Sequence, residues 1–293
     1  METGHQDVIH DTQFNYYGQL LATGGSDRTV KIFEVTNGSQ SLVATLTGHD
    51  GPVWMVGWAH PRFGNIIASA SYDGKAIVWN NSGAVYKPVH IVTSHTSSVN
   101  GISWAPQQFG LVLATASSDG SIGITRCDGQ WNDTIKVGGN GVAHPMGAMA
   151  VSFLPHFAGA KYPVFASAGC DGHVRLWSLA DGWTSLGNFQ DHSEWVRDVA
   201  FSPVVGDSSF AMLASCAQDK KVVIRRKKVS AIDDGSAWET STTTLEKGAW
   251  RLSWSPCGRM LLVTTQDSEC VLLKEGPVFT DAWQSVPLGD DQK

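Results

Sequence analysis

One motif recurs six times along the 293-residue chain, and its regular spacing constrains the fold more than any other feature. Each copy has a short apolar run ending in small residues, an aspartate in a tight-turn context, and a β-branched run with a bulky residue near its end. The intervals between turn aspartates are 46, 46, 52, 48 and 48 residues, for Asp27, Asp73, Asp119, Asp171, Asp219 and Asp267. A fixed period of this length is typical of architectures in which each repeat forms one supersecondary unit.

The second copy shows how one repeat divides into strands. VWMVGW (53–58), IIASAS (66–71) and KAIVW (75–79) have the β-branched and apolar character of strands, and SLVATL (41–46) is an example of a fourth, outer strand. Four short antiparallel strands per repeat are typical of one blade of a β-propeller. The sequence therefore predicts an all-β fold in which residues 1–293 form a single propeller domain of six four-stranded blades.

Histidine, serine, aspartate and tryptophan recur at matched places in these copies. A histidine precedes an aromatic residue by nine positions in five copies, and the sixth has Leu245 there. In the second copy, one buried hydrogen-bond chain can join His49, either Ser69 or Ser71, Asp73 and Trp79. The other copies supply further members of the predicted structural network: His95, Asp119, His144, Asp171, Trp177, His192, Asp219, Asp27 and Asp267. This pattern is typical of WD40 repeats.

Serine, histidine and aspartate together can also form the catalytic triad of a hydrolase. An enzyme has little use for several identical triads, so the recurrence favours the structural interpretation. The sequence shows no phosphate-binding glycine loop, and its histidine pairs have no third metal ligand nearby. We therefore predict no catalytic site, no cofactor and no metal.

Charge and cysteine content exclude several other classes. The formal charge of −6 argues against a phosphate backbone as the main ligand, because such binders concentrate Lys and Arg. The N-terminus has no apolar run typical of a signal peptide, and no stretch has the length of a membrane span. The five cysteines are scattered without a C-x-x-C pair, which fits a reducing compartment. We expect a soluble protein that binds other proteins.

The two ends of the chain lack a strand that could close a ring of blades. Four residues precede His5, and EGPVFTDAWQSV (275–286) can supply the last copy's own outer strand. We therefore predict an open propeller in which every blade is contiguous in sequence. The predicted seam residues are Leu20, Val30, Trp250, Leu252 and Leu261. A partner can cover such a seam by adding strands, or the first and last blades can pack directly, and the spacing leaves both possibilities open.

Four segments closely resemble a known family: residues 48–79, 94–110, 191–203 and 250–267. The combinations GPVW with WAHP, SVN with WAP, and EWVRDVA with SP are more particular than the turns shared by all WD proteins. They resemble the small WD-repeat subunit of the outer COPII vesicle coat. That family also serves in the Y-shaped scaffold complex of the nuclear pore.

The resemblance implies a non-catalytic scaffold subunit for ER-to-Golgi transport and for the nuclear pore. It implies an open six-bladed propeller that a large α-solenoid partner completes with one inserted blade, giving a hetero-oligomer. It places the chain in the cytoplasm on ER exit sites and COPII vesicles, attached to membranes through the coat, and at the nuclear envelope. Members of the family also occur in a complex that regulates amino-acid signalling through TORC1.

Several alternatives stay open at this point. The other small WD protein of the pore scaffold shares the open architecture, and a peptide-binding WD40 adaptor would use the mouth of the central channel. An enzymatic propeller would need non-repeating polar residues that converge on its axis, and the sequence gives no sign of them. The basic run KKVVIRRKK (220–228) fits a nuclear localisation signal, a contact with an acidic partner or, as we favour, a solvated edge strand.

Overall fold

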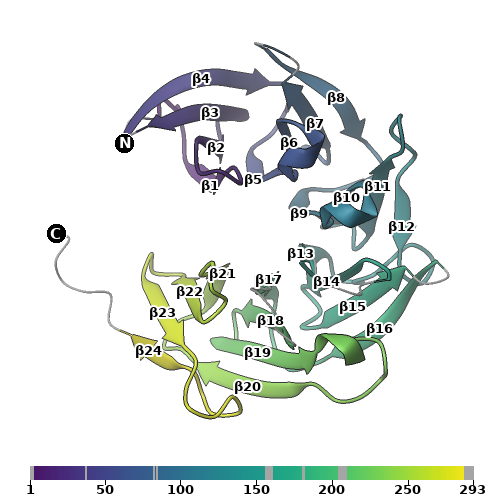
Figure 1. The fold of residues 1–293 in the computed structure, drawn as a ribbon, viewed down its shortest axis with the longest axis vertical. Helices are drawn as coiled ribbons and strands as arrows, with labels where there is room; N and C mark the ends of the chain where they lie inside the picture. Colours follow the sequence, from purple (N-terminus) through teal and green to yellow (C-terminus); the bar gives the residue numbers. More distant parts are fainter. Residues whose placement is uncertain are drawn as a thin grey trace. The chain divides into compact units, whose positions relative to one another are not determined.

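The computed structural model describes residues 3–36, 38–81, 83, 85–155, 161–179, 182–203 and 210–286, and the structural statements below concern these residues. They form twenty-four β-strands and three short 3-10 turns. The strands make six antiparallel sheets, and each sheet consists of four strands that are consecutive in sequence (Figure 1). The predicted all-β fold of six four-stranded blades is confirmed, and the blades are numbered here in chain order.

The first compact unit, Met1–Ala148, contains blades 1 to 3. Blade 1 consists of β1 (Ile9–Phe14), β2 (Leu20–Gly25), β3 (Thr29–Thr36) and β4 (Ser39–Thr47). Blade 2 consists of β5 (Val53–Trp58), β6 (Ile66–Ser71), β7 (Ala76–Asn81) and β8 (Tyr86–Val92). Blade 3 consists of β9 (Val99–Trp104), β10 (Leu111–Ser117), β11 (Ile122–Cys127) and β12 (Ile135–Val137).

The second unit, Met149–Lys293, holds blades 4 to 6 except for the first residue of β13. Blade 4 consists of β13 (Ala148–Phe153), β14 (Val164–Gly169), β15 (Val174–Leu179) and β16 (Trp183–Phe189). Blade 5 consists of β17 (Val196–Phe201), β18 (Phe210–Ala217), β19 (Lys221–Lys228) and β20 (Glu239–Thr244). Blade 6 consists of β21 (Ala249–Trp254), β22 (Met260–Thr265), β23 (Cys270–Lys274) and β24 (Gln284–Val286). The expectation of a single domain over 1–293 stays a prediction.

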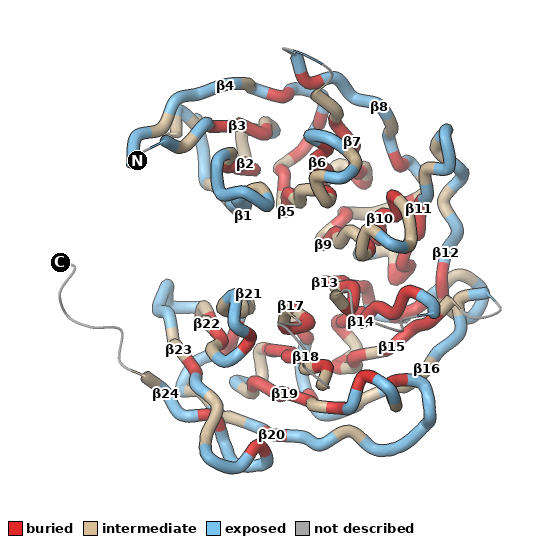
Figure 2. Tube along the Cα trace, viewed as in Figure 1, coloured by how far each residue is buried: buried red, intermediate tan, exposed pale blue. Residues whose placement is uncertain are grey.

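Apolar clusters between neighbouring blades form the core of each unit. In blades 1 and 2, for example, Val30 and Ile32 of β3 pack with Val53 and Val56 of β5. Comparable clusters join blades 2 and 3, blades 4 and 5, and blades 5 and 6. The two middle strands of each blade carry many of these buried residues, while the outermost strands are largely exposed (Figure 2). In blades 2 and 5, both faces of a middle strand are therefore apolar, because each face meets a neighbouring blade of the same unit.

The turn between the second and third strands needs a residue with positive φ directly after its aspartate. Gly74, Gly120 and Gly172 take this place in blades 2, 3 and 4, with φ of 82°, 84° and 76°. A Cβ atom on Gly120 would lie 2.3 Å from the carbonyl oxygen of His144, so this position admits no side chain. Non-glycine residues adopt the same conformation in the other three blades, at Arg28, Lys220 and Ser268.

A β-bulge interrupts the first strand of at least five blades at its second residue. In blade 2, Val53 pairs with Ser71 and Met55 with Ala70, which leaves Trp54 without a partner in the ladder. The same irregularity recurs in blades 1, 3, 5 and 6, where the bulged residues are His10, Asn100, Arg197 and Trp250. A bulge of this kind turns its side chain away from the regular sheet faces. Among the described residues, no helix is long and apolar enough to cross a membrane.

Candidate functional site

Blade 2 contains a buried hydrogen-bond chain that joins His49, two residues after β4, to the β6–β7 turn. The indole N–H of Trp79 donates to Ser69 Oγ over 2.9 Å, and Ser69 Oγ lies 2.7 Å from His49 Nε2. At the other side of the ring, His49 Nδ1 lies 3.0 Å from Asp73 Oδ2. Ser71 instead accepts the backbone N–H of Asp73. Ser69 is therefore the serine of the chain, and Ser71 supports the turn.

The carboxylate at one end of the chain and the indole N–H at the other determine which atom donates in each hydrogen bond. The Asp73 carboxylate can only accept, so the Nδ1 atom of His49 carries the proton. The Nε2 atom of His49 is then an acceptor, so the Ser69 hydroxyl donates to it while accepting from Trp79. Burial lowers the pKa of His49, although the nearby Asp73 carboxylate opposes this effect. The lowered pKa favours the neutral ring, in which Nε2 accepts the hydrogen bond of the Ser69 hydroxyl.

Backbone donors hold the Asp73 carboxylate in its ionised form. Burial raises the pKa of Asp73, but hydrogen bonds from the backbone of Asp50 and Lys75 and from His49 outweigh it. Both backbone nitrogens lie 2.9 Å from the carboxylate oxygens. The net pKa of Asp73 lies below its usual value, so the carboxylate stays charged at neutral pH.

Blades 1, 3 and 5 repeat the histidine–aspartate pair, but each has another residue in place of the tryptophan. Nδ1 to carboxylate distances are 2.9, 3.2 and 3.1 Å for His5–Asp27, His95–Asp119 and His192–Asp219. Each second ring nitrogen also contacts a hydroxyl of the second strand, in Thr23, Thr115 and Ser215. The position of the blade 2 tryptophan is occupied by Phe33, Thr125 and Arg225. The pair is thus a feature of the repeat, and the tryptophan is an optional addition.

Blade 4 keeps the tryptophan. The indole N–H of Trp177 donates to Ser167 Oγ over 2.9 Å, and Asp171 forms an ion pair with Arg175 over 2.7 Å. His144 is fully buried in the first unit, whereas Asp171 and Trp177 belong to the second.

Blade 6 has a different arrangement because Leu245 replaces the histidine. Asp267 forms an ion pair with Lys247 over 2.8 Å, and both side chains are 50% exposed. The turn aspartate of blade 6 is therefore at the surface, and its pair contributes little stability compared with a buried one.

These networks are closed to a substrate. Ser69 is fully buried, and its hydroxyl is held between two ring nitrogens. A nucleophile must reach a substrate carbon, so a serine in this position cannot act as one. Among the residues that the structure describes, no group of three or more His, Cys, Asp and Glu side chains could hold a metal ion. The blade 2 arrangement ties its strands together, and its serine is not placed to act as a nucleophile.

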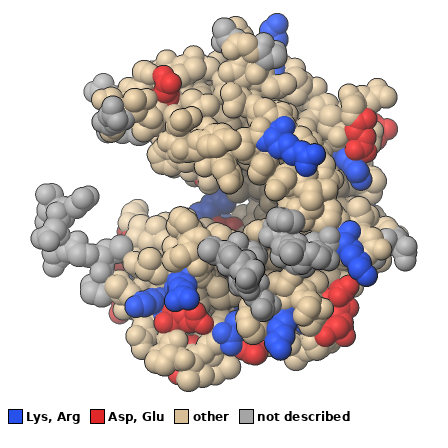
Figure 3. Space-filling view, viewed as in Figure 1, with Lys and Arg blue, Asp and Glu red and all other residues tan. Residues whose placement is uncertain are grey.

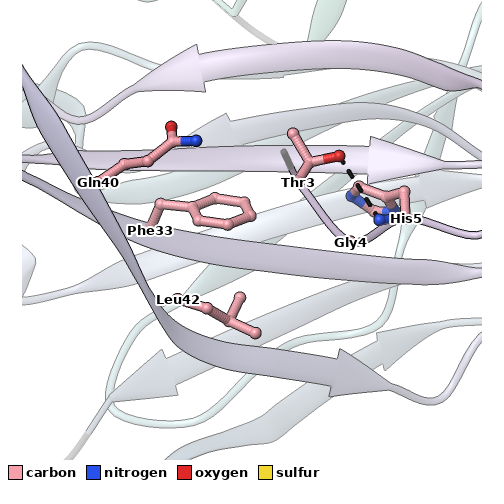
Figure 4. A pocket seen from close by; sticks show the side chains of 6 residues that line it. All are labelled: Thr3, Gly4, His5, Phe33, Gln40 and Leu42. Atoms are coloured by element: carbon pink, nitrogen blue, oxygen red, sulfur yellow. Dashed lines mark hydrogen bonds between the residues drawn. The ribbon is translucent and has the colours of Figure 1, made fainter. Parts of the chain in front are cut away.

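Blade 1 presents an apolar face on the side opposite blade 2, here called its outward face. Strand pairing places one residue of each strand in a row across it: Phe14, Leu21, Phe33 and Leu42. Phe14 is 56% and Leu42 is 54% exposed. A pocket of about 690 Å³ opens on this face, and in Figure 4 the Phe33 ring lies between the Gln40 and Leu42 side chains. Its remaining lining residues are Thr3, Gly4 and His5.

Blade 6 has a corresponding outward face, on the side opposite blade 5. Leu261, Val263 and Leu273 belong to the cluster with blade 5, so strand alternation turns Met260, Leu262 and Leu272 the other way. All three are incompletely buried. The first and last blades thus each carry apolar side chains on a face that no blade of their own unit covers.

The seam residues predicted from sequence lie elsewhere, and this prediction is corrected here. Val30 belongs to the cluster between blades 1 and 2, and Leu20 packs against it. Leu261 belongs to the cluster between blades 5 and 6, and Leu252 packs against it. Trp250 stacks on Arg197 of blade 5. Successive residues of a strand point to opposite faces, so the sequence identified the right strands and the wrong face.

The basic run 220–228 is largely β19, and its side chains are engaged within unit 2. Arg225 pairs with Asp191, Arg226 lies 2.6 Å from a Glu239 carboxylate oxygen, and Lys227 pairs with Asp234. On the face drawn in Figure 3, basic side chains lie in small groups, several of them beside acidic ones. β19 pairs with both β18 and β20, and Arg225 and Lys227 are buried, so the prediction of a solvated edge strand is wrong. The ion pairs give the basic run a structural role within its own unit.

Comparison with known proteins gives a match to one family model, "WD domain, G-beta repeat". The model matches residues 1–34, 40–80, 86–124 and 183–225. The matched segments include the histidine–aspartate pairs of blades 1, 2, 3 and 5.

Curated relatives match over nearly the full length of the chain. "Protein transport protein sec13" of Schizosaccharomyces pombe is 42% identical, over 97% of this chain and 97% of the relative. "Protein transport protein SEC13" of Mycosarcoma maydis is 37% identical, over 98% of this chain and 93% of the relative. "Protein SEC13 homolog" of Drosophila melanogaster is 40% identical, over 94% of this chain and 80% of the relative.

Proposed function

Because the chain belongs to the SEC13 family of WD-repeat proteins, we propose that it is a non-catalytic scaffold subunit of the COPII vesicle coat and of the nuclear pore Y-complex. The observation that carries this proposal is the pair of outward apolar faces on blades 1 and 6. Every described blade consists of four consecutive strands, and no blade of the same unit covers either face. A protein with such faces gains stability when a partner buries them.

The partner in this proposal is a large α-solenoid subunit that contributes one additional blade. If the partner's blade packs on the outward face of blade 1, it would cover Phe14 and Leu42. One of its side chains would then enter the pocket beside Phe33. Burial of an apolar side chain contributes about 1.5–3 kcal/mol, so a few such contacts support a long-lived complex. Membrane attachment would then come through the coat, at ER exit sites and COPII vesicles, and a second pool would lie at the nuclear envelope.

Binding to the α-solenoid coat subunit tests the proposal. Leu42→Glu places a charge on the outward face of blade 1, where the side chain is half exposed in the unbound protein. Ile135→Glu is the matched control, because Ile135 also lies on an outermost strand and is 61% exposed. We expect Leu42→Glu to weaken binding by about 2 kcal/mol or more, while Ile135→Glu leaves it unchanged. Calorimetry with purified proteins measures both.

Two results would contradict the proposal. Equal binding by the wild-type and Leu42→Glu proteins would place the contact elsewhere, and equal loss in both variants would indicate a nonspecific effect of charge. The same measurement with an α-solenoid nucleoporin and with a subunit of the TORC1-regulating complex separates the remaining family assemblies. A peptide-binding adaptor would bind none of them through this face.

A further inference from the structure

The bulged residue, second in the first strand of a blade, places its side chain at one end of the sheet. In blades 5 and 6 this residue is Arg197 and Trp250, and both follow a fully buried first strand residue, Val196 or Ala249. Trp195 precedes β17 and accepts a hydrogen bond at its carbonyl from the turn residue Gln218. The three side chains therefore lie at the end of blades 5 and 6 where the aspartate turns are found.

Arg197 lies between two exposed indole rings. Its guanidinium carbon is 4.4 Å from the centre of the Trp250 ring and 5.1 Å from that of Trp195. The two tryptophans are 42% and 43% exposed. Tryptophan is large and apolar, and two such rings held at the surface beside a cation are typical of an interface anchor.

The charge of Arg197 is not matched within the described part of the chain. Its Nε atom is buried and has no hydrogen-bond partner, and no ion pair joins Arg197 to a carboxylate among the described residues. Burial lowers the pKa of Arg197, and the groups that oppose this are the thiols of Cys170 and Cys216.

Two carboxylates lie next to Arg197 in the sequence, and neither pairs with it. Asp198 accepts the backbone N–H groups of Leu252 and Val199, and the side chain of Glu194 is exposed. A partly desolvated guanidinium without a carboxylate is therefore ready to accept one from outside.

We propose that Trp195, Arg197 and Trp250 form a docking site for a peptide segment in which an acidic side chain stands beside an apolar one. The carboxylate would pair with the terminal nitrogens of Arg197, whose planar fork suits two parallel hydrogen bonds. The apolar side chain would pack on the exposed indole faces. The site uses none of the residues assigned to the outward faces of blades 1 and 6, so the proposal goes beyond the proposed scaffold function.

A peptide fits this site better than a nucleic acid. Stacked bases also bind exposed aromatic rings, but such sites follow the phosphate backbone with a groove of several cations. The chain has a formal charge of −6, and Arg197 is the single cation of this cluster. One cation flanked by two apolar rings matches one carboxylate flanked by apolar groups.

A displayed library of short random peptides, selected on the full-length chain, tests the proposal. We expect enrichment of peptides with Asp or Glu next to Leu, Ile or Phe. Affinity for a selected peptide should fall about tenfold or more in Arg197→Gln and in Trp250→Ala. The controls are Arg62→Gln and Tyr72→Ala, which change an exposed cation and an aromatic ring that is 63% exposed in unit 1.

A measurement on the wild-type chain avoids dependence on the folding of any variant. Replacing the acidic residue of a selected peptide by its amide should abolish binding, and added salt should weaken the binding of the acidic peptide. Recovery of no peptide, of peptides without an acidic residue, or of peptides that bind Arg197→Gln equally well would overturn the proposal. Tighter binding of single-stranded oligothymidine than of any peptide, with the same loss in Arg197→Gln, would also overturn it.

Discussion

Replacing Ser69 by alanine removes the centre of the hydrogen-bond chain in blade 2. The Ser69 hydroxyl donates to His49 and accepts from Trp79, so Ser69→Ala leaves a buried ring nitrogen on each side without its partner. His49 is 8% and Trp79 is 2% exposed, and the change creates room for no more than the missing oxygen atom. Water therefore cannot replace the serine.

The expected loss follows from counting the groups left unpaired. Each buried polar group without a partner costs about 1–3 kcal/mol, and two such groups cost about 2–6 kcal/mol. A domain is stable by about 5–15 kcal/mol in total, so the variant should lose a large part of its free energy of unfolding. Trp79→Phe removes a donor and leaves Ser69 with its histidine, so we expect a loss of about 1–2 kcal/mol from it.

Urea unfolding of the four proteins in a double-mutant cycle measures the coupling. In the double variant the donor that Ser69→Ala would leave unpaired is already absent. The combined loss should therefore be about 1–2 kcal/mol smaller than the sum of the single losses. Ser178→Ala is the control, because Ser178 is 4% exposed and its hydroxyl has no hydrogen-bond partner within the described residues.

Two outcomes would refute this reasoning. A loss in Ser69→Ala no larger than in Ser178→Ala would mean that the chain of hydrogen bonds contributes nothing net. Strict additivity in the cycle would mean that Trp79 and Ser69 act independently, and the proton directions assigned above would then have no energetic consequence.

Three further predictions follow from the buried charges and thiols. Burial lowers the pKa of His49 and His95 below the ordinary value of 6.5, so the unfolded chain takes up protons first. The free energy of unfolding should then fall as the pH drops from about 7 to 5, and a flat urea-midpoint profile would contradict this. Asp191→Asn should lower stability by about 1–3 kcal/mol, because it removes the carboxylate beside buried Arg225, whose pKa burial lowers to about 10. Cys257 is exposed and its pKa is lowered by a hydrogen bond with a neighbouring serine, so iodoacetamide should label it before the two buried thiols; simultaneous labelling in the native protein would oppose this.

The fold was predictable because the same pattern of strands and turn aspartate recurs six times in the sequence. The aspartate spacing gave the number of blades, and copies with altered residues could be aligned through complete ones. Thr125 and Arg225 illustrate this, since each occupies the tryptophan position of its blade without any resemblance to tryptophan. Their register follows from the distance to the turn aspartate, which depends on backbone geometry rather than on side-chain identity.

The outward faces were not predictable to the residue. Middle strands of these blades are apolar on both sides, so hydrophobicity alone does not tell which side meets a neighbour. Val30 and Leu261 are apolar members of the right strands, and both face the neighbouring blade. Leu21, which follows Leu20, and Leu262, which follows Leu261, face the other way, and only strand register separates the two sets.

The bulged residue, second in the first strand, differs from blade to blade. A binding site can therefore arise at this position without a change in the rest of the repeat. The first strand residue before the bulge is fully buried in blades 2, 3, 5 and 6, so packing fixes it as a small or β-branched apolar residue. The residue after it turns away from the regular sheet faces and contacts side chains near the adjacent blade, as Trp54 does at Ser98 and Trp250 at Arg197, so the apolar packing between sheets does not fix its identity. It is Trp54, Asn100, Arg197 and Trp250 in these four blades. A repeat protein can change its ligand at such positions without disturbing a blade, and the Trp195, Arg197 and Trp250 cluster is the place where this chain combines a cation with two exposed rings.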